Sequence, residues 1–149
     1  MRRTIRTLLA GGVLLAAASC GTATGSNAPA YVASAPTTGG PGFTCEALSR
    51  AYGKNMAPLA QALTTLVADR KTVTQAQKSL AAFATSVAEA TKTSDDAQIR
   101  ADGKQAADRM RAKSADKKFF AAIKTTKDVD QTMGPTLTEW LSPVARHCS

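Results

Sequence analysis

Two cysteines, Cys45 and Cys148, stand near the two ends of the part of this chain that carries charged residues and patterned apolar residues. A disulfide between them would need their Cα atoms within about 7 Å of each other. The start of the first structural element would then have to meet the end of the last, and an even number of antiparallel legs achieves this naturally. Two reduced, buried cysteines are the alternative, and the cellular compartment decides between the two.

The N-terminus has the pattern of a bacterial export signal. Arg2, Arg3 and Arg6 precede an uncharged and mostly apolar run, TLLAGGVLLAAAS, that ends at Ser19. Such a run has the length of a signal-peptide core and is shorter than the ~20 residues that a membrane-spanning helix needs. We therefore expect residues 1–19 to be a signal peptide that is removed.

The residues before Cys20 indicate lipid attachment. Ala17, Ala18 and Ser19 resemble the lipobox of bacterial lipoproteins, with Ala17 where leucine is usual. The resemblance implies cleavage before Cys20, acylation of this cysteine by chains such as palmitate, and a location on the extracytoplasmic face of the cell membrane. A chain rich in Ala and Thr is similar to lipoproteins of high-GC Gram-positive bacteria. Cleavage after Ala18 would instead give a secreted, unmodified protein.

Acylation of Cys20 leaves an even number of cysteines. Cysteine pairs of exported proteins form disulfides in the oxidising environment outside the cytoplasm. We therefore predict a disulfide between Cys45 and Cys148. In the chain-entropy model, closing a loop of about 100 residues contributes on the order of 4.7 kcal/mol, less any strain in the native state.

Composition divides the rest of the chain into two parts. Residues 20–43 have no charge and no sustained apolar period, so we expect a disordered, flexible linker behind the anchored Cys20. A flexible coil of this kind would span about 26 Å. The alternative is an ordered arm with Tyr31, Val32 and Phe43 as its apolar anchors. We expect the folded domain over residues 44–149.

From Thr44 onward, apolar residues recur at steps of three, four and seven, which predicts helices. The expected helices begin at Thr44, Thr74, Ser94, Ser114 and near Lys127. Their expected buried faces comprise Leu48, Tyr52, Leu59, Leu63 and Leu66, then Leu80, Phe83, Ala84 and Val87, then Ile99, Gly103, Ala106 and Met110, and finally Val129, Met133, Leu137, Trp140 and Leu141.

Particular residues predict where these helices start and bend. Thr74 and Gln77 match a capping box. Pro58 lacks a backbone donor, so we expect a kink or a break between Gly53 and Pro58. Gly134 and Pro135 are expected to disturb the last helix.

No segment has the alternation of a β-strand. The predicted class is therefore all-α: an antiparallel bundle of four to five helices, closed by one disulfide. The short fourth helix either extends the third leg obliquely or joins the last leg. Phe119, Phe120 and Ile123 lie on a different face from the third helix, which places the boundary near Ser114.

Catalytic and metal-binding patterns are weak. The single histidine, His147, adjoins Cys148 and is expected to be an exposed terminal residue. Asp95 with Asp96, and Asp128 with Asp130, lack the glycine and distal glutamate of a calcium loop, and acids at helix starts explain them better. We therefore expect no enzyme, no metal site and no cofactor. An enzyme would have to use carboxylates such as Glu89 or Glu139.

The basic residues cluster between Ile99 and Lys127, where nine basic residues outnumber three acidic ones. Arg100, Lys104 and Arg111 share one side of the third helix and form a candidate anion-binding stripe for lipid headgroups or envelope phosphate polymers. A solvated helix surface is the alternative. Nucleic acid is not an expected partner of an extracytoplasmic protein.

These features predict a non-enzymatic lipoprotein of the cell envelope that binds a partner protein or an envelope component. The alternative is a carrier that holds a haem-like or lipid-like small molecule between its helices. The layout, a short exported helical domain with a cysteine near each end, is similar to that of secreted mycobacterial haem-binding proteins, although this chain has no mid-chain histidine.

Overall fold

Helices make up nearly all of the chain that the structure describes. The computed structural model describes residues 39–149, so the expected signal peptide, Cys20 and most of the expected linker lie outside the described residues. The elements are, in chain order, α1 (Pro41–Ala68), the 3₁₀ turn η1 (Arg70–Thr72), α2 (Val73–Thr91), α3 (Ala97–Ala115), α4 (Lys117–Ala122), α5 (Thr126–Asp128), the π-helical segment η2 (Val129–Met133), α6 (Gly134–Ala145) and the 3₁₀ turn η3 (Arg146–Cys148). The predicted all-α class is confirmed.

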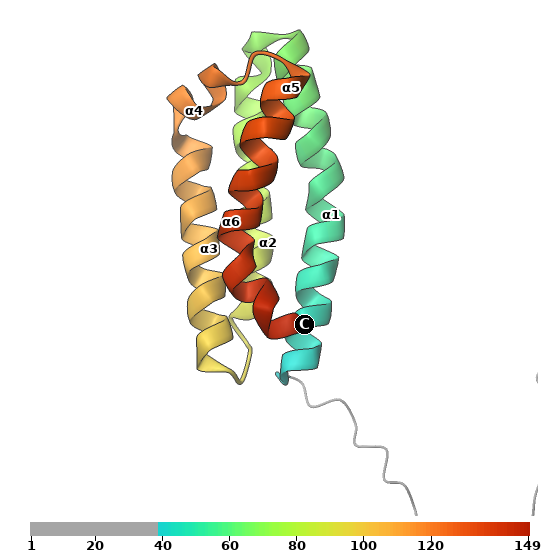
Figure 1. The fold of residues 1–149 in the computed structure, drawn as a ribbon, viewed down its shortest axis with the longest axis vertical. Helices are drawn as coiled ribbons and strands as arrows, with labels where there is room; N and C mark the ends of the chain where they lie inside the picture. The colour runs from blue at the N-terminus through green and yellow to red at the C-terminus, as the bar shows by residue number, and fades with distance from the viewer. Residues whose placement is uncertain (1–38) are drawn as a thin grey trace, which may run out of the picture. The chain divides into compact units, whose positions relative to one another are not determined.

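Four antiparallel legs form the bundle (Figure 1). The legs are α1, α2, α3 and a last leg that runs through α5, η2 and α6. Helix α2 packs along both α1 and α3, and α6 packs along α3. The short α4 continues from the end of α3 and also reaches α2. Of the two arrangements expected for the fourth helix, the structure thus has the one in which it extends the third leg.

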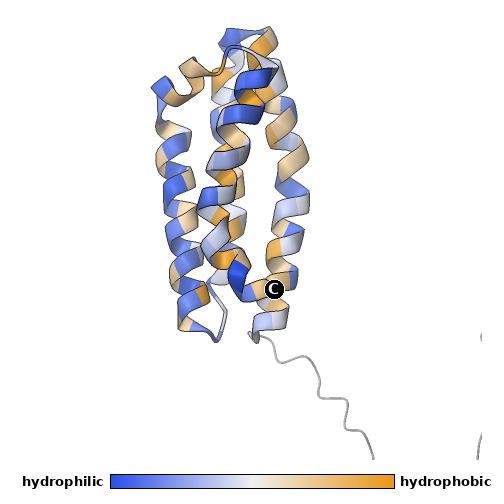
Figure 2. Cartoon of the chain, in the orientation of Figure 1, coloured by the Kyte–Doolittle hydropathy of each residue, from blue (hydrophilic) through white to orange (hydrophobic). Residues whose placement is uncertain are grey.

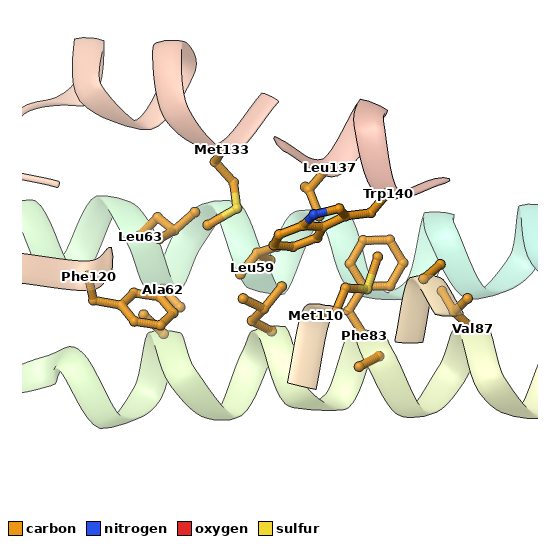
Figure 3. Packing of buried hydrophobic residues seen from close by; sticks show 14 of the residues in the cluster. Leu59, Ala62, Leu63, Phe83, Val87, Met110, Phe120, Met133, Leu137 and Trp140 are labelled. Atoms are coloured by element: carbon orange, nitrogen blue, oxygen red, sulfur yellow. The ribbon is translucent and has the colours of Figure 1, made fainter. Parts of the chain in front are cut away.

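The core lies between the four legs and is built mostly from the predicted faces. Hydrophobic and hydrophilic residues alternate along each leg, and α3 is mostly hydrophilic (Figure 2). Phe83 of α2, Met110 of α3 and Trp140 of α6 meet near the centre of the bundle (Figure 3). The prediction that Tyr52 is buried is wrong, because this residue is 48% exposed.

Aspartates, not the predicted serines, cap α3 and α4. The side chain of Asp96 accepts hydrogen bonds from the backbone N–H groups of Gln98 and Ile99, and Asp116 likewise caps α4. The predicted caps, Ser94 and Ser114, lie two residues earlier in each case. A carboxylate at this position accepts hydrogen bonds from the N–H groups of the second and third helical residues, and its charge is stabilised by the helix dipole.

The starts of α1 and α2 also differ from the prediction. Gly40 precedes α1 and Pro41 occupies its first turn, where the missing N–H of proline carries no penalty. Residues 41–43 therefore belong to α1 and not to the linker. Helix α2 begins at Val73 after a turn capped by Asp69, so the predicted start at Thr74 lies inside the helix.

The two prolines that were expected to disturb helices have different outcomes. Helix α1 runs without a break through Pro58. Pro58 and Lys54 are both exposed, so the Lys54 carbonyl, which loses its helical partner, faces water. Pro135 lies at the start of α6, directly after the π-helical segment η2, where the hydrogen-bond ladder already changes register.

Candidate functional site

The side of the bundle between α1 and α6 is less tightly closed than the other three sides. In the described part of the chain, α1 and α6 do not run in close contact, and the last leg meets α1 mainly through η3, near the start of α1. Three hollows lie along this seam, lined mostly by residues of α1 and of the last leg.

The first hollow lies at the disulfide end of the seam and has a volume of about 260 Å³. Phe83 and Val87 of α2 contribute to its lining from behind the seam. The rest of the lining comes from the α1 and α6 legs: Cys45, Leu48, Ser49, Tyr52, Leu141, Val144, Ala145 and Cys148. Among the described residues that line this hollow, none carries a charge.

The second and third hollows continue the first along the seam. Tyr52, Leu141 and Ala145 line both the first hollow and the second, which has a volume of about 390 Å³. Met56, Gly134 and Leu137 line both the second and the third, of about 250 Å³. We call these three adjacent hollows the α1–α6 groove. Asp130, at the far end, is the one charged residue among its described lining.

The sequence explains why the groove stays open. Small residues, Ser49, Ala60, Gly134 and Ala145, are part of its lining, and their side chains are too short to bridge the seam. Tyr52 packs edge-on against Phe83 with ring centroids 5.8 Å apart, yet about half of its surface is exposed. Large apolar residues therefore form the walls while small ones leave the space between them.

The C-terminal turn η3 is fastened to both of its neighbours. The predicted disulfide joins Cys148 to Cys45 of α1, with Cα atoms 5.5 Å apart. His147, expected to be exposed, has only 24% of its side chain exposed, and its Nε2 lies 3.0 Å from Oδ2 of Asp102 on α3. The turn is thus tied to α1 by a covalent bond and to α3 by a polar contact.

Two of the four acids singled out from the sequence cap helices. Asp96 caps α3 and Asp128 forms a capping box with Thr125. Hydrogen bonds from the backbone N–H groups of Ile99 and Gln98 lower the pKa of Asp96. Hydrogen bonds from the backbone N–H groups of Lys124 and Thr125, and with the Thr125 hydroxyl, lower the pKa of Asp128. Both are therefore ionised at neutral pH.

The remaining carboxylates do not gather into a site. Within residues 39–149, no three His, Cys, Asp or Glu side chains come together as a metal-binding cluster. Glu89 pairs with Lys92, and Glu139 pairs with Arg109 across 3.5 Å, in both cases on the exposed surface.

The three residues of the candidate anion-binding stripe all have local partners. Lys104 and Arg111 contact the two carboxylate oxygens of Asp108 at 2.6 and 3.1 Å, and Arg100 donates to the carbonyl oxygen of Ser94. The Lys104 hydrogen bond, followed by the weaker Arg111 contact, lowers the pKa of Asp108. Two of the three charges are thus partly neutralised, and anion binding by the stripe stays a prediction.

Comparison with protein-family models, curated proteins and solved structures finds no match to this chain. None of the helices described between residues 39 and 149 combines the length and apolarity needed to cross a membrane. The α1–α6 groove is the feature that sequence reasoning missed. The signal that could have revealed it is the set of small residues that interrupts the apolar stripes of the first and last helices.

Proposed function

We propose that this chain is a non-catalytic binding protein of the bacterial cell envelope, anchored through acylated Cys20, which holds an apolar ligand in the α1–α6 groove. The observation that carries this proposal is a row of three adjacent hollows whose lining is almost entirely uncharged. Ligand sites in proteins are typically concave and mostly apolar, with a few polar groups that orient the ligand.

The groove supports a small ligand more directly than the broader expectation of a partner protein or envelope component. Apolar side chains such as Leu48, Tyr52 and Leu141 remain partly exposed along the seam. Covering them would remove apolar surface from water, at about 25 cal/mol per Å². Thr138 and Ser142 of the second hollow supply the polar groups of the groove.

A fluorescence titration tests the proposal. The mature chain, with Cys20→Ser so that no attached acyl chain competes, is titrated with phenylnaphthylamine, an apolar fluorophore. Trp140 is the only tryptophan of the chain and lies beside groove residue Leu141, so energy transfer from Trp140 reports binding near the seam. We expect saturable transfer with about one site per chain.

Two matched variants make the test specific to the groove. Ala145→Phe fills the junction of the first and second hollows from an exposed position. Ala82→Phe adds the same side chain on the exposed outer face of α2. We expect Ala145→Phe to weaken binding at least tenfold and Ala82→Phe to leave it unchanged. Absence of saturable binding, or equal binding by both variants, would refute the proposal.

A further inference from the structure

The ligand of the groove can be specified further from its shape, its chemistry and its position in the chain. We propose that the α1–α6 groove takes a single acyl chain of a lipid from the membrane to which the protein is anchored. This inference rests on the proposed function and names the ligand class of the same site.

The groove is long relative to the volume of its hollows. From Leu48 to Leu63, its α1 wall extends about 22 Å at 1.5 Å per residue. A lipid acyl chain spans about half of the ~30 Å hydrocarbon core of a bilayer, or about 15 Å, and therefore fits within this length. The individual hollows hold between 250 and 390 Å³. An α-helix with its side chains is about 10–12 Å wide and would lie on such a seam rather than within it.

The chemistry of the lining favours a hydrocarbon chain over a peptide. An extended peptide brings backbone N–H and C=O groups that need partners, and leaving them unpaired in an apolar site costs free energy. The lining offers few polar groups, among them Ser49, Thr138 and Ser142. A methylene chain makes no such demand. Met56 and Met133 line the third hollow, and their flexible side chains can adapt to an acyl chain of variable shape.

The groove begins at the end of the bundle where the expected tether joins. The backbone N–H of Asp95, in the loop between α2 and α3, donates to the carbonyl oxygen of Gly39 at 2.7 Å, two residues before α1 begins. This loop, the start of α1 and the C-terminus all lie at the same end in Figure 1. The first hollow, lined by Cys45 and Cys148, is at this end as well.

This position places the first hollow at the end of the bundle that lies nearer to the expected anchor. With Cys20 acylated, about 19 residues would separate the anchor from Gly39, and a flexible coil of that length spans about 24 Å. The tether would therefore allow the first hollow to come within reach of the membrane surface. A lipid acyl chain that leaves the outer leaflet would enter the uncharged end of the groove first. Asp130 lies at the opposite end of the groove.

Photo-crosslinking in vesicles tests the inference. The acylated mature chain is placed in phosphatidylglycerol vesicles that contain a phospholipid with a diazirine halfway along one acyl chain, and the crosslinked residues are mapped by mass spectrometry. We expect crosslinks to wall residues such as Leu48, Tyr52 and Leu141, at least fivefold fewer in Ala145→Phe, and an unchanged number in Ala82→Phe. Crosslinks confined to residues outside the groove, or equal in both variants, would overturn the inference.

A displacement assay separates this inference from the proposed function. Lysophosphatidylglycerol should displace phenylnaphthylamine from the Cys20→Ser chain, while a soluble amphipathic peptide and haemin should not. Displacement by haemin or the peptide, but not by the lysolipid, overturns the acyl-chain inference and leaves an apolar-ligand site in place. Failure of phenylnaphthylamine to bind at all overturns both.

Discussion

Cys45 and Cys148 join the two walls of the α1–α6 groove at one end, with their Cα atoms 5.5 Å apart. One cysteine lies in the first turns of α1 and the other ends the turn after α6. The α1 and α6 backbones are not close along most of the seam, and the two helices otherwise meet through core side chains such as Leu59 and Leu137, so this bond is a covalent link between legs that are packed only loosely. The disulfide therefore supports both the stability of the bundle and the shape of the first hollow.

Removing the disulfide should destabilise the protein substantially. The double variant Cys45→Ser, Cys148→Ser should lose about 2–5 kcal/mol of unfolding free energy, because the unfolded chain regains the entropy that a loop of this length had lost. Urea denaturation followed by circular dichroism measures the loss. Reduced wild-type protein is the control and should match the double variant. A midpoint unaffected by reductant would contradict the structural role of the bond.

Substitution of Gly103 should be harmful because α2 and α3 meet there. A Cβ atom on Gly103 would overlap the buried side chain of Thr91, whose hydroxyl donates to the Val87 carbonyl oxygen. Gly103→Ala should therefore cost about 1–3 kcal/mol of unfolding free energy, the usual cost of overpacking. Adding Thr91→Ala should recover part of the loss, and denaturation of the single and double variants checks this.

A second glycine serves as the matched control. A Cβ atom on Gly53, within α1, meets no other atom within 4 Å. Gly53→Ala should raise the unfolding free energy by about 0.5–1 kcal/mol, because alanine loses less backbone entropy in a helix. If both glycine variants shifted stability in the same direction, the close approach of α2 and α3 at Gly103 would be disproved.

The cap of α3 should make stability depend on pH. Hydrogen bonds from the N–H groups of Ile99 and Gln98 hold the pKa of Asp96 below its ordinary value of about 3.9. A group with a lowered pKa stabilises the fold above its ordinary value, and this contribution is lost as the pH falls through the lowered pKa. Asp96→Ala should therefore melt at a lower temperature than wild type at neutral pH, and the difference should shrink below about pH 4.

Thermal melts of wild type and Asp96→Ala across this pH range test the prediction. Asp130→Ala removes an exposed aspartate that does not cap a helix, and it controls for the change in net charge. A difference between wild type and Asp96→Ala that stays constant from neutral to acid pH would show that the Asp96 carboxylate does not act as a charged cap.

Mass spectrometry of the membrane fraction should find the mature N-terminus at an acylated Cys20. Cys20→Ser should release the protein from the membrane, since the attached chains would be its anchor. Spectra with and without reductant should also differ by the two hydrogens of the Cys45–Cys148 bond. A membrane-derived chain that begins at an unmodified Ser19 would refute the anchor.

The helical class, the disulfide and most buried faces could be predicted from the sequence because each depends on local pattern or on cysteine parity. Phe83 and Val87, for example, recur at helical spacing and are buried. The helix boundaries were harder to predict from the sequence. Serine and aspartate both cap helices, and only the backbone geometry selected Asp96 over Ser94 and Asp116 over Ser114.

The groove could not be predicted from periodicity. Tyr52 and Leu141 occupy the same helical stripes as fully buried residues, and periodicity does not reveal whether a neighbouring helix covers a stripe. That outcome depends on the spacing of α1 and α6, which all four legs determine together. The contact of His147 could likewise not be predicted, since its partner Asp102 lies far away in sequence.

The methionine methyl groups offer the most direct measurement of ligand binding in the groove. After removal of Met1 with the signal peptide, three methionines remain. Met56 and Met133 line the groove, whereas Met110 is fully buried in the core and is not part of the groove lining.

Titration of methyl-labelled protein with phenylnaphthylamine, followed by nuclear magnetic resonance, should therefore shift the Met56 and Met133 signals saturably through the ring currents of the probe. The Met110 signal should move little. Methyl signals that all remain unchanged at saturating probe, or a shift confined to Met110, would contradict the account.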